Sequence, residues 1–451
     1  MKLSLLHCRI LLFGLFCLSC TGCKKSSTSS TPATSSINSI NHVVVIYLEN
    51  HSFDNLYGQF SGAHGISDAT PATTIQDSLT GVPYIYLPVI PGTDKFPANL
   101  PNAPFNIDQY IPSDMPTPDL AHSYYQEQMQ INGGKMDMFA RYNYSKGMSQ
   151  GYYTTSKLPL AVLAQKYTLC DNFFHSAFGG SFLNHIWLIA AASPIFPDAP
   201  TNIVSSVDPI TGSVIADGQV SPDGYVINTS YTINNPHPSW STVQDLLPNQ
   251  TLPTIGDRLN DKNITWGWYS GGWNDAIAGN PAATFQFHHQ PFAYFANYAD
   301  GTPLKAAHLK DETDFFTAAT IGTLPSVTFV KPLGIDSEHP GYTNVYDGEM
   351  HAIELINAVL TGPNGKDAVI IVTYDENGGF WDHVPPPVID TKWGPGTRVP
   401  TIIISPFAKM GFVDHTQYDT VSILSFIEKR WGLAPLSNRD KIAKPLTNAF
   451  N

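Results

Sequence analysis

The sequence has very little cysteine outside its first residues. Four of its five cysteines, Cys8, Cys17, Cys20 and Cys23, precede residue 24, and only Cys170 lies further along the chain. A single thiol cannot form an intrachain disulfide, so no such bond supports the fold. The same scarcity excludes a zinc site built on two or more thiolates.

Charged residues are scarce as well, and the basic ones form no run. Charged residues make up 14% of the chain, and the formal net charge at pH 7 is −13. Without a basic patch to neutralise a phosphate backbone, nucleic-acid binding is disfavoured. An acidic protein that handles anionic substrates needs local compensation from a metal ion or from clustered histidines.

Residues 1–22 have the pattern of an export signal. Lys2 and Arg9 precede or flank an apolar stretch at residues 10–18, and small residues follow it. This stretch is too short to cross a bilayer comfortably. We therefore expect a signal peptide rather than a stable transmembrane helix.

The end of this leader is similar to a bacterial lipobox. In Cys20-Thr21-Gly22-Cys23, Cys23 is the expected lipidated residue, and Cys20 is a second candidate. The alternative is an ordinary cleaved signal peptide with incidental cysteines. The Ser/Thr-rich residues 23–38 predict a flexible linker. The prediction is an exported, lipid-anchored protein on a bacterial membrane, facing the periplasm or the cell surface.

The remaining residues, 39–451, predict one large α/β domain. Hydrophobic residues make up 42% of the chain, while 34 glycines and 36 prolines indicate many loops. Continuous apolar runs predict buried strands, and amphipathic segments predict helices. We expect strands at residues 42–48, 326–330, 368–372 and 399–404, and helices at residues 351–360 and 420–431.

This alternation is typical of an α/β/α sandwich with a mostly parallel central sheet. Residues 195–255 differ, because Pro, Gly, Ser, Asn and Asp interrupt short β-type stretches there. We interpret them as a loop-rich, β-containing cap or insertion over the sheet edge.

Two expected strands end abruptly in polar residues. Residues 368–372 lead into Asp375-Glu376, and residues 42–48 lead into Glu49-Asn50. The carboxyl edge of the sheet in an α/β protein is where ligands usually bind. Neighbouring carboxylates there usually hold a cation or split their pKa values.

A serine follows two glycines at the expected start of an apolar helix. In Gly179-Gly180-Ser181, the position places Ser181 at a helix N-terminus, where free amides favour an anion. Asn184 and His185 would lie on the same face. The plain alternative is that Ser181 only caps the helix.

Several histidines lie in polar loops or after strands, namely His122, His288, His289, His339 and His383. Any one of them alone is more often structural than catalytic, although loop positions favour function. By spacing alone, the residues indicate no more than a metal-dependent hydrolase.

Four motifs in order along the chain resemble the bacterial phosphoesterase family, which contains acid phosphatases and phosphatidylcholine-type phospholipases C. They are residues 49–54, residues 179–181, Glu338-His339-Pro340 and the long segment 375–387. The resemblance implies an alkaline-phosphatase-like fold, with residues 39–451 as the catalytic domain.

The resemblance also implies roles for single residues. Glu49, Asn50, Asp375 and Glu376 would bind one divalent metal ion, with Ser181 as nucleophile and further ligand. His122, His289, His339 and His383 would surround the phosphate, and His289 is chosen over His288 because Gln-Pro-Phe follows it. Oxygen ligands favour Ca²⁺, Mg²⁺ or Mn²⁺.

The expected activity is that of an acid phosphatase that cleaves phosphomonoesters through a phosphoserine. Ser181 and its flanking residues are similar to that branch of the family, whereas the phospholipase branch more often has a threonine nucleophile. The alternative is a phospholipase C that cleaves phosphatidylcholine-type diesters, for which a membrane tether is reasonable. A non-catalytic surface binding lipoprotein is the third reading. The sequence leaves the oligomeric state open.

Overall fold

The structure is a computed structural model that describes residues 36–208 and 213–451. The expected signal peptide, Cys23 and the linker up to residue 35 lie outside the described residues. Residues 36–38, at the end of the predicted linker, belong to a 3-10 turn, Ser36–Ser39, and Ile37 in this turn is buried in the core.

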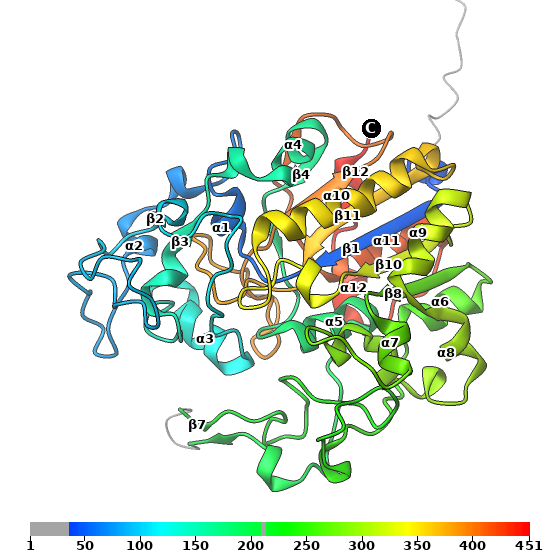
Figure 1. Cartoon of the computed structure of the whole chain (residues 1–451), viewed down its shortest axis with the longest axis horizontal. Helices are drawn as coiled ribbons and strands as arrows, with labels where there is room; N and C mark the ends of the chain where they lie inside the picture. The colour runs from blue at the N-terminus through cyan, green and yellow to red at the C-terminus, as the bar shows by residue number, and fades with distance from the viewer. Residues whose placement is uncertain (1–35, 209–212) are drawn as a thin grey trace, which may run out of the picture. The chain divides into compact units, whose positions relative to one another are not determined.

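An eight-stranded sheet forms the centre of residues 36–451 (Figure 1). Its strands are β1 (His42–Leu48), β4 (Thr168–Cys170), β8 (Trp266–Ser270), β9 (Leu309–Asp311), β10 (Val327–Lys331), β11 (Ala368–Tyr374), β12 (Thr401–Ile404) and β13 (Phe412–Asp414). The spatial order is β13-β4-β12-β11-β1-β10-β8-β9. Within this sheet, β12 alone runs antiparallel to its neighbours.

Helices cover the sheet in two packed groups. In one group α10 packs against α4 and α9, and in the other α11 packs against α5 and α12. Figure 1 shows α10 along one face of the sheet. The described helices are α1 (Phe53–Tyr57), α2 (Pro71–Thr74), α3 (Tyr124–Ile131), α4 (Pro159–Lys166), α5 (Ser181–Ala190), α6 (Ile255–Asp261), α7 (Trp273–Ile277), α8 (Pro303–His308), α9 (Glu312–Ile321), α10 (Val345–Thr361), α11 (Val421–Trp431) and α12 (Asn438–Ile442).

Within residues 36–208 and 213–451, three further strand pairs lie outside the central sheet: β2 (Phe105–Asn106) with β3 (Gly151–Tyr152), β5 (Phe173–Phe174) with β14 (Tyr418–Asp419), and β6 (Ser206–Val207) with β7 (Val214–Ala216). The pair β6–β7 belongs to the predicted insertion. The other described residues of that segment, 195–205, 208, 213 and 217–254, form loops, isolated bridges and short 3-10 turns.

The apolar runs form the central strands because both faces of the sheet are covered. Every residue of β10, β11 and β12 is buried. The α/β/α sandwich and its mostly parallel sheet are therefore confirmed. α10 begins six residues earlier than expected, at Val345, because Asn344 caps it by accepting a hydrogen bond from the Asp347 amide.

No helix within residues 36–208 and 213–451 combines the length and the apolar character needed to cross a bilayer.

Candidate active site

The central parallel strands bring the two acidic motifs together. β1 and β11 pair in register up to Leu48 opposite Tyr374. Glu49 directly follows β1 and Asp375 directly follows β11. The Asp375 amide donates a hydrogen bond to the Leu48 carbonyl at 3.1 Å. Stretches more than 300 residues apart in sequence thus end side by side at the carboxyl edge.

The acidic groups at this edge are fully buried and feel each other's charge. Burial and the charge of Glu49 raise the pKa of Asp375 well above its ordinary value. Burial and the charge of Asp375 do the same to the pKa of Glu376. Burial opposes the ionisation of Glu49 too, but His289 and Lys331 outweigh it and hold the pKa of Glu49 well below its usual value.

Several polar atoms at this edge lack hydrogen-bond partners. Asp375 Oδ2, Glu376 Oε1 and Asn50 Nδ2 are buried without a hydrogen-bond partner, and the ring nitrogen His185 Nδ1 lies 3.6 Å from Asp375 Oδ2. An unsatisfied buried oxygen is costly unless a cation or donor meets it. The residues present therefore fit a divalent cation held by hard oxygen ligands.

Ser181 is the first residue of α5, and its hydroxyl faces this acidic edge. The hydroxyl donates to Asn50 Oδ1 at 3.4 Å and also lowers the pKa of Asp375, beside which it lies. Gly179 must be glycine because its φ is +92° and a Cβ would come within 2.6 Å of Tyr124 Cα. This close approach fixes the turn that presents Ser181 together with the free amides of the α5 N-terminus.

A cavity of about 660 Å³ opens at Ser181. Its wall includes Glu49 and three of the predicted histidines, His122, His289 and His339. The structure therefore brings Glu49, Ser181 and these three histidines to one cavity. Asn50 and Asp375 are not part of its wall but contact Ser181, and Glu376 follows Asp375 and is influenced by its charge.

Backbone carbonyls hold two of these histidines. His122 Nδ1 lies 2.7 Å from the Leu120 carbonyl, and His339 Nδ1 lies 2.6 Å from the Pro340 carbonyl. A carbonyl only accepts, so in each ring the proton sits on Nδ1, which leaves Nε2 for the substrate or for a second proton. The His339 ring also stacks on Tyr342, with centroids 4.1 Å apart.

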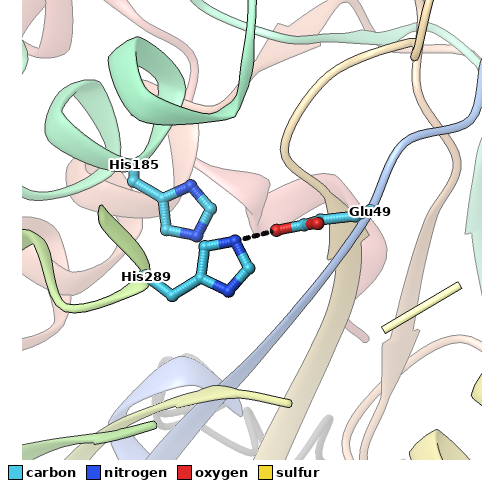
Figure 2. A group of neighbouring side chains, drawn as sticks. All are labelled: Glu49, His185 and His289. Carbon is cyan, nitrogen blue, oxygen red and sulfur yellow. Dashed lines mark ion pairs between the residues drawn. The ribbon is translucent and has the colours of Figure 1, made fainter. Parts of the chain in front are cut away.

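His289 contacts Glu49 directly through its Nε2 atom. Figure 2 shows this contact and the His185 ring beside it, which stacks on His289 with centroids 5.0 Å apart. His288 also lines the cavity but makes no ion pair with Glu49 among the described contacts. The choice of His289 over His288 is consistent with this geometry. Burial lowers the pKa of His289 to about 4.

The structure does not place His383 on the wall of this cavity. Its Nδ1 lies 2.6 Å from Asp54 Oδ2, and the neighbouring Asp382 carboxylate binds Arg398. Burial disfavours the charged ring, but Asp54 outweighs it and raises the pKa of His383. A role for His383 at the phosphate stays a prediction.

Sequence reasoning missed one residue at the site, Lys331, and named another, His185, only as a neighbour of Ser181. Lys331, the last residue of β10, is fully buried and its Nζ lies 2.6 Å from Glu49 Oε1. His185 forms a potential metal-binding group with Glu49 and His289 (Figure 2). The signal for Lys331 was its position, since it follows an expected strand at the same edge as Glu49 and Asp375.

Comparison with known proteins found one family model and several relatives. The model of the Phosphoesterase family matches residues 40–434. Phospholipase C B of Mycobacterium tuberculosis (strain CDC 1551 / Oshkosh) is 25% identical over 91% of this chain and 77% of its own length. Non-hemolytic phospholipase C of Burkholderia pseudomallei is 26% identical over 91% of this chain, which spans only 59% of that protein.

Among solved structures, a Vibrio parahaemolyticus protein in the alkaline phosphatase superfamily aligns with a TM-score of 0.34 and 11% identity, over 71% of this chain and 70% of that one. Murine ectonucleotide pyrophosphatase / phosphodiesterase 5, in its inactive form with AMP, aligns with a TM-score of 0.33 and 10% identity, over 64% of this chain and 95% of that one.

Proposed function

The chain belongs to the Phosphoesterase family and is a hydrolase of phosphoester bonds, and from that premise we propose that it is a phosphomonoesterase of the acid phosphatase type. The single observation that carries the proposal is the position of the Ser181 hydroxyl. It lies at the N-terminus of α5, beside Asn50 and Asp375, and lines a cavity whose wall also includes four histidines.

In the proposed reaction the Ser181 oxygen attacks phosphorus and the alcohol leaves. The phosphoserine is then hydrolysed by water, which restores the hydroxyl. The amides of the α5 N-terminus, and His122 and His339 when protonated at Nε2, would stabilise the charge on the phosphoryl oxygens. His289 holds Glu49 through its own Nε2 atom. A monoester has three such oxygens, which is consistent with His122, His289 and His339 around one cavity.

Glu49, Asn50, Ser181, Asp375 and Glu376 would hold one divalent metal ion, with Ca²⁺, Mg²⁺ or Mn²⁺ favoured by their oxygen atoms. When bound, such an ion lowers the pKa of a coordinated hydroxyl and polarises the phosphoryl group. Lys331 already offsets part of the charge of Glu49 in the folded protein.

We assign the proton for the leaving oxygen to His339, with His122 beside it. The two rings lie 5.8 Å apart and both line the cavity, whereas His383 does not. His383 would instead position Asp54 and, through Arg398, the loop that follows β11.

A phospholipase C is the second candidate, and two observations favour it. The relatives named above are phospholipases C. The rim of the cavity also combines the carboxylates of Asp119 and Asp217 with the rings of Tyr144, Tyr231 and Tyr342. Carboxylates and aromatic faces suit a cationic head group.

Turnover of p-nitrophenyl phosphate and of p-nitrophenylphosphorylcholine separates these candidates. We expect a higher kcat/KM for the monoester. A strong preference for the choline diester would replace the first candidate by the second, because both probes release the same reporter and differ only in the group on phosphorus.

Replacing Ser181 tests the nucleophile itself. We expect Ser181→Ala to reduce kcat by roughly four orders of magnitude or more on either substrate, since the attacking oxygen is lost. Ser425→Ala is the matched control, because Ser425 lies in α11 and its hydroxyl donates to the Ala443 carbonyl, away from the cavity wall. Unchanged turnover in folded Ser181→Ala would remove Ser181 from the mechanism.

We further propose that the protein is exported and anchored through Cys23, which supports action on substrates outside the cell or in the periplasm. Cys23→Ala should move the protein from the membrane fraction to the soluble fraction. Retention in the membrane fraction would point to Cys20 or to another mode of attachment.

A further inference from the structure

A second group of metal-binding side chains lies outside the catalytic cavity. His64, Asp171 and His415 each offer a ligand atom, and these atoms lie within 4.8 Å of one another. None of the three lines the catalytic cavity. We propose that they bind a divalent transition-metal ion, such as Zn²⁺, separately from the catalytic cation.

The sheet places two of these residues next to each other. β4 and β13 pair in parallel up to Cys170 opposite Asp414. Asp171 directly follows β4 and His415 directly follows β13, so the two residues lie side by side at the carboxyl ends of these strands. The third residue, His64, lies in the loop between α1 and the turn Ile66–Asp68.

Backbone contacts fix the loop that carries His64. The His64 amide donates to Asp171 Oδ2 at 2.8 Å, and its carbonyl accepts from Arg398 at 2.9 Å. Gly65 packs so closely that a Cβ would lie 2.2 Å from the Gly58 carbonyl oxygen. His64 is therefore held beside Asp171 by the backbone and not by its own ring.

The side chains are arranged to receive an ion from solvent. Asp171 is fully buried, and its Oδ1 atom has no hydrogen-bond partner. His415 Nδ1 lies 2.8 Å from the other oxygen, Oδ2, although half of the His415 side chain is exposed. The exposed rings of His64 and His415 stack with centroids 4.6 Å apart. A buried carboxylate with one oxygen that lacks a hydrogen-bond partner thus belongs to the same ligand group as two accessible imidazoles.

The ligand chemistry differs from that of the catalytic site. Two imidazoles and one carboxylate suit Zn²⁺, Cu²⁺ or Ni²⁺ better than Ca²⁺ or Mg²⁺. Tetrahedral Zn²⁺ with bonds of about 2.0–2.1 Å needs ligand atoms roughly 3.4 Å apart, so small ring rotations suffice. The ion would join the ends of β4 and β13 to the His64 loop.

Zinc binding to the full chain tests this proposal. The variants are the double substitution His64→Ala with His415→Ala, and the control His237→Ala, whose ring contacts the Asn234 carbonyl and belongs to no described metal-binding group. After equilibrium dialysis against dilute zinc chloride, the wild type and the control should each retain one more zinc ion per chain than the double variant. Zinc should also raise the Tm of the first two proteins more than that of the double variant.

Any zinc bound at the catalytic site contributes equally to the zinc content of all these proteins, because Glu49, His185 and His289 are present in each of them. Phosphoesterase activity reports folding, since neither substituted residue touches the catalytic cavity. Equal zinc content and equal Tm shifts in the wild type and the double variant would overturn the proposal. Should the double variant not fold, His415→Gln replaces it, with an expected loss in zinc affinity of at least about tenfold, since losing a direct ligand costs no less than losing a group that orients one.

Discussion

At the scale of single residues, the candidate site depends on how charge is balanced within the buried edge of the sheet. Asp375 and Glu376 have raised pKa values, while Glu49 has a lowered one. The difference arises because Lys331 and His289 both form direct ion pairs with Glu49, whereas burial and neighbouring carboxylates dominate at Asp375 and Glu376. Glu49 is thus the one of these three carboxyls that stays ionised to the lowest pH.

Lys331→Met should destabilise the metal-free protein. The change removes one partner of a buried ion pair and leaves Glu49 less compensated, so we expect a loss of about 3 to 5 kcal/mol in the free energy of unfolding. Urea denaturation in a chelator measures it. The control is Lys157→Met, since Lys157 is exposed and pairs with Asp108 at 3.5 Å; it should cost at most about 1 kcal/mol. Similar losses in both variants would contradict this view of Lys331.

His383 predicts a dependence of stability on pH. The ring faces Asp54, Asp382 and Arg398, and its pKa in the folded protein is raised. Its contribution is therefore fully present below the unfolded pKa of about 6.5, and it is lost as the pH rises through the folded pKa.

The measurement compares wild type with His383→Gln, which keeps a polar side chain but cannot take up the proton. Urea denaturation should show a larger stability gap at pH 6 than at pH 9, of the order of 1 to 3 kcal/mol at the lower pH. A gap that is constant across this range would show that the ring is not charged in the folded state.

At the scale of elements, the loop after β11 determines whether the acidic residues meet. Gly378 has a φ of +61°, and a Cβ there would lie 2.1 Å from the Asn50 carbonyl oxygen. The loop therefore packs directly on the backbone that follows β1, and a side chain at residue 378 would force the two segments apart.

Gly378→Ala should consequently reduce both activity and stability. We expect at least tenfold lower kcat/KM and a loss of roughly 2 kcal/mol or more, measured by p-nitrophenyl phosphate turnover and by urea denaturation. Gly432→Ala is the control that separates backbone strain from steric clash. Gly432 has a similar φ of +62°, but no atom lies within 4 Å of the position that a Cβ would take. The control should lose about 1 kcal/mol and no activity.

The sequence predicted the central strands well, because strands buried on both faces are continuously apolar. Each apolar run stops where the polar residues of the following loop begin. It predicted the start of α10 poorly, since Asn344 and the buried Gly348 and Glu349 do not follow an amphipathic pattern. It also could not place His383, because the direction of a loop side chain depends on tertiary contacts, here those with Asp54. Lys331 was visible at a strand end, but a lysine is more often exposed than buried.

At the scale of the whole molecule, the unpartnered oxygens at the sheet edge predict that a metal ion supports both stability and activity. Removal of divalent ions by a chelator should abolish turnover and lower the Tm. An ion present at about a hundred times its Kd should restore roughly 2.7 kcal/mol. Calcium, magnesium and manganese should restore activity better than zinc.

Thermal denaturation and turnover after chelation and re-addition of each ion provide the test. Asp375→Asn is the reference variant, because it should bind the ions weakly and gain little stability from them. Full activity of the wild type in excess chelator would contradict the proposed ligand role of Glu49, Asn50, Asp375 and Glu376.

The reactivity of the Cys170 thiol can report on the opening of the central sheet around β4. Cys170 is the last residue of β4, fully buried, and burial raises the pKa of its thiol. β4 lies between β12 and β13, so an alkylating reagent reaches the sulfur only when strands separate. The rate at which Cys170 is modified, followed by peptide mass spectrometry, therefore measures how often this side of the sheet opens under native conditions.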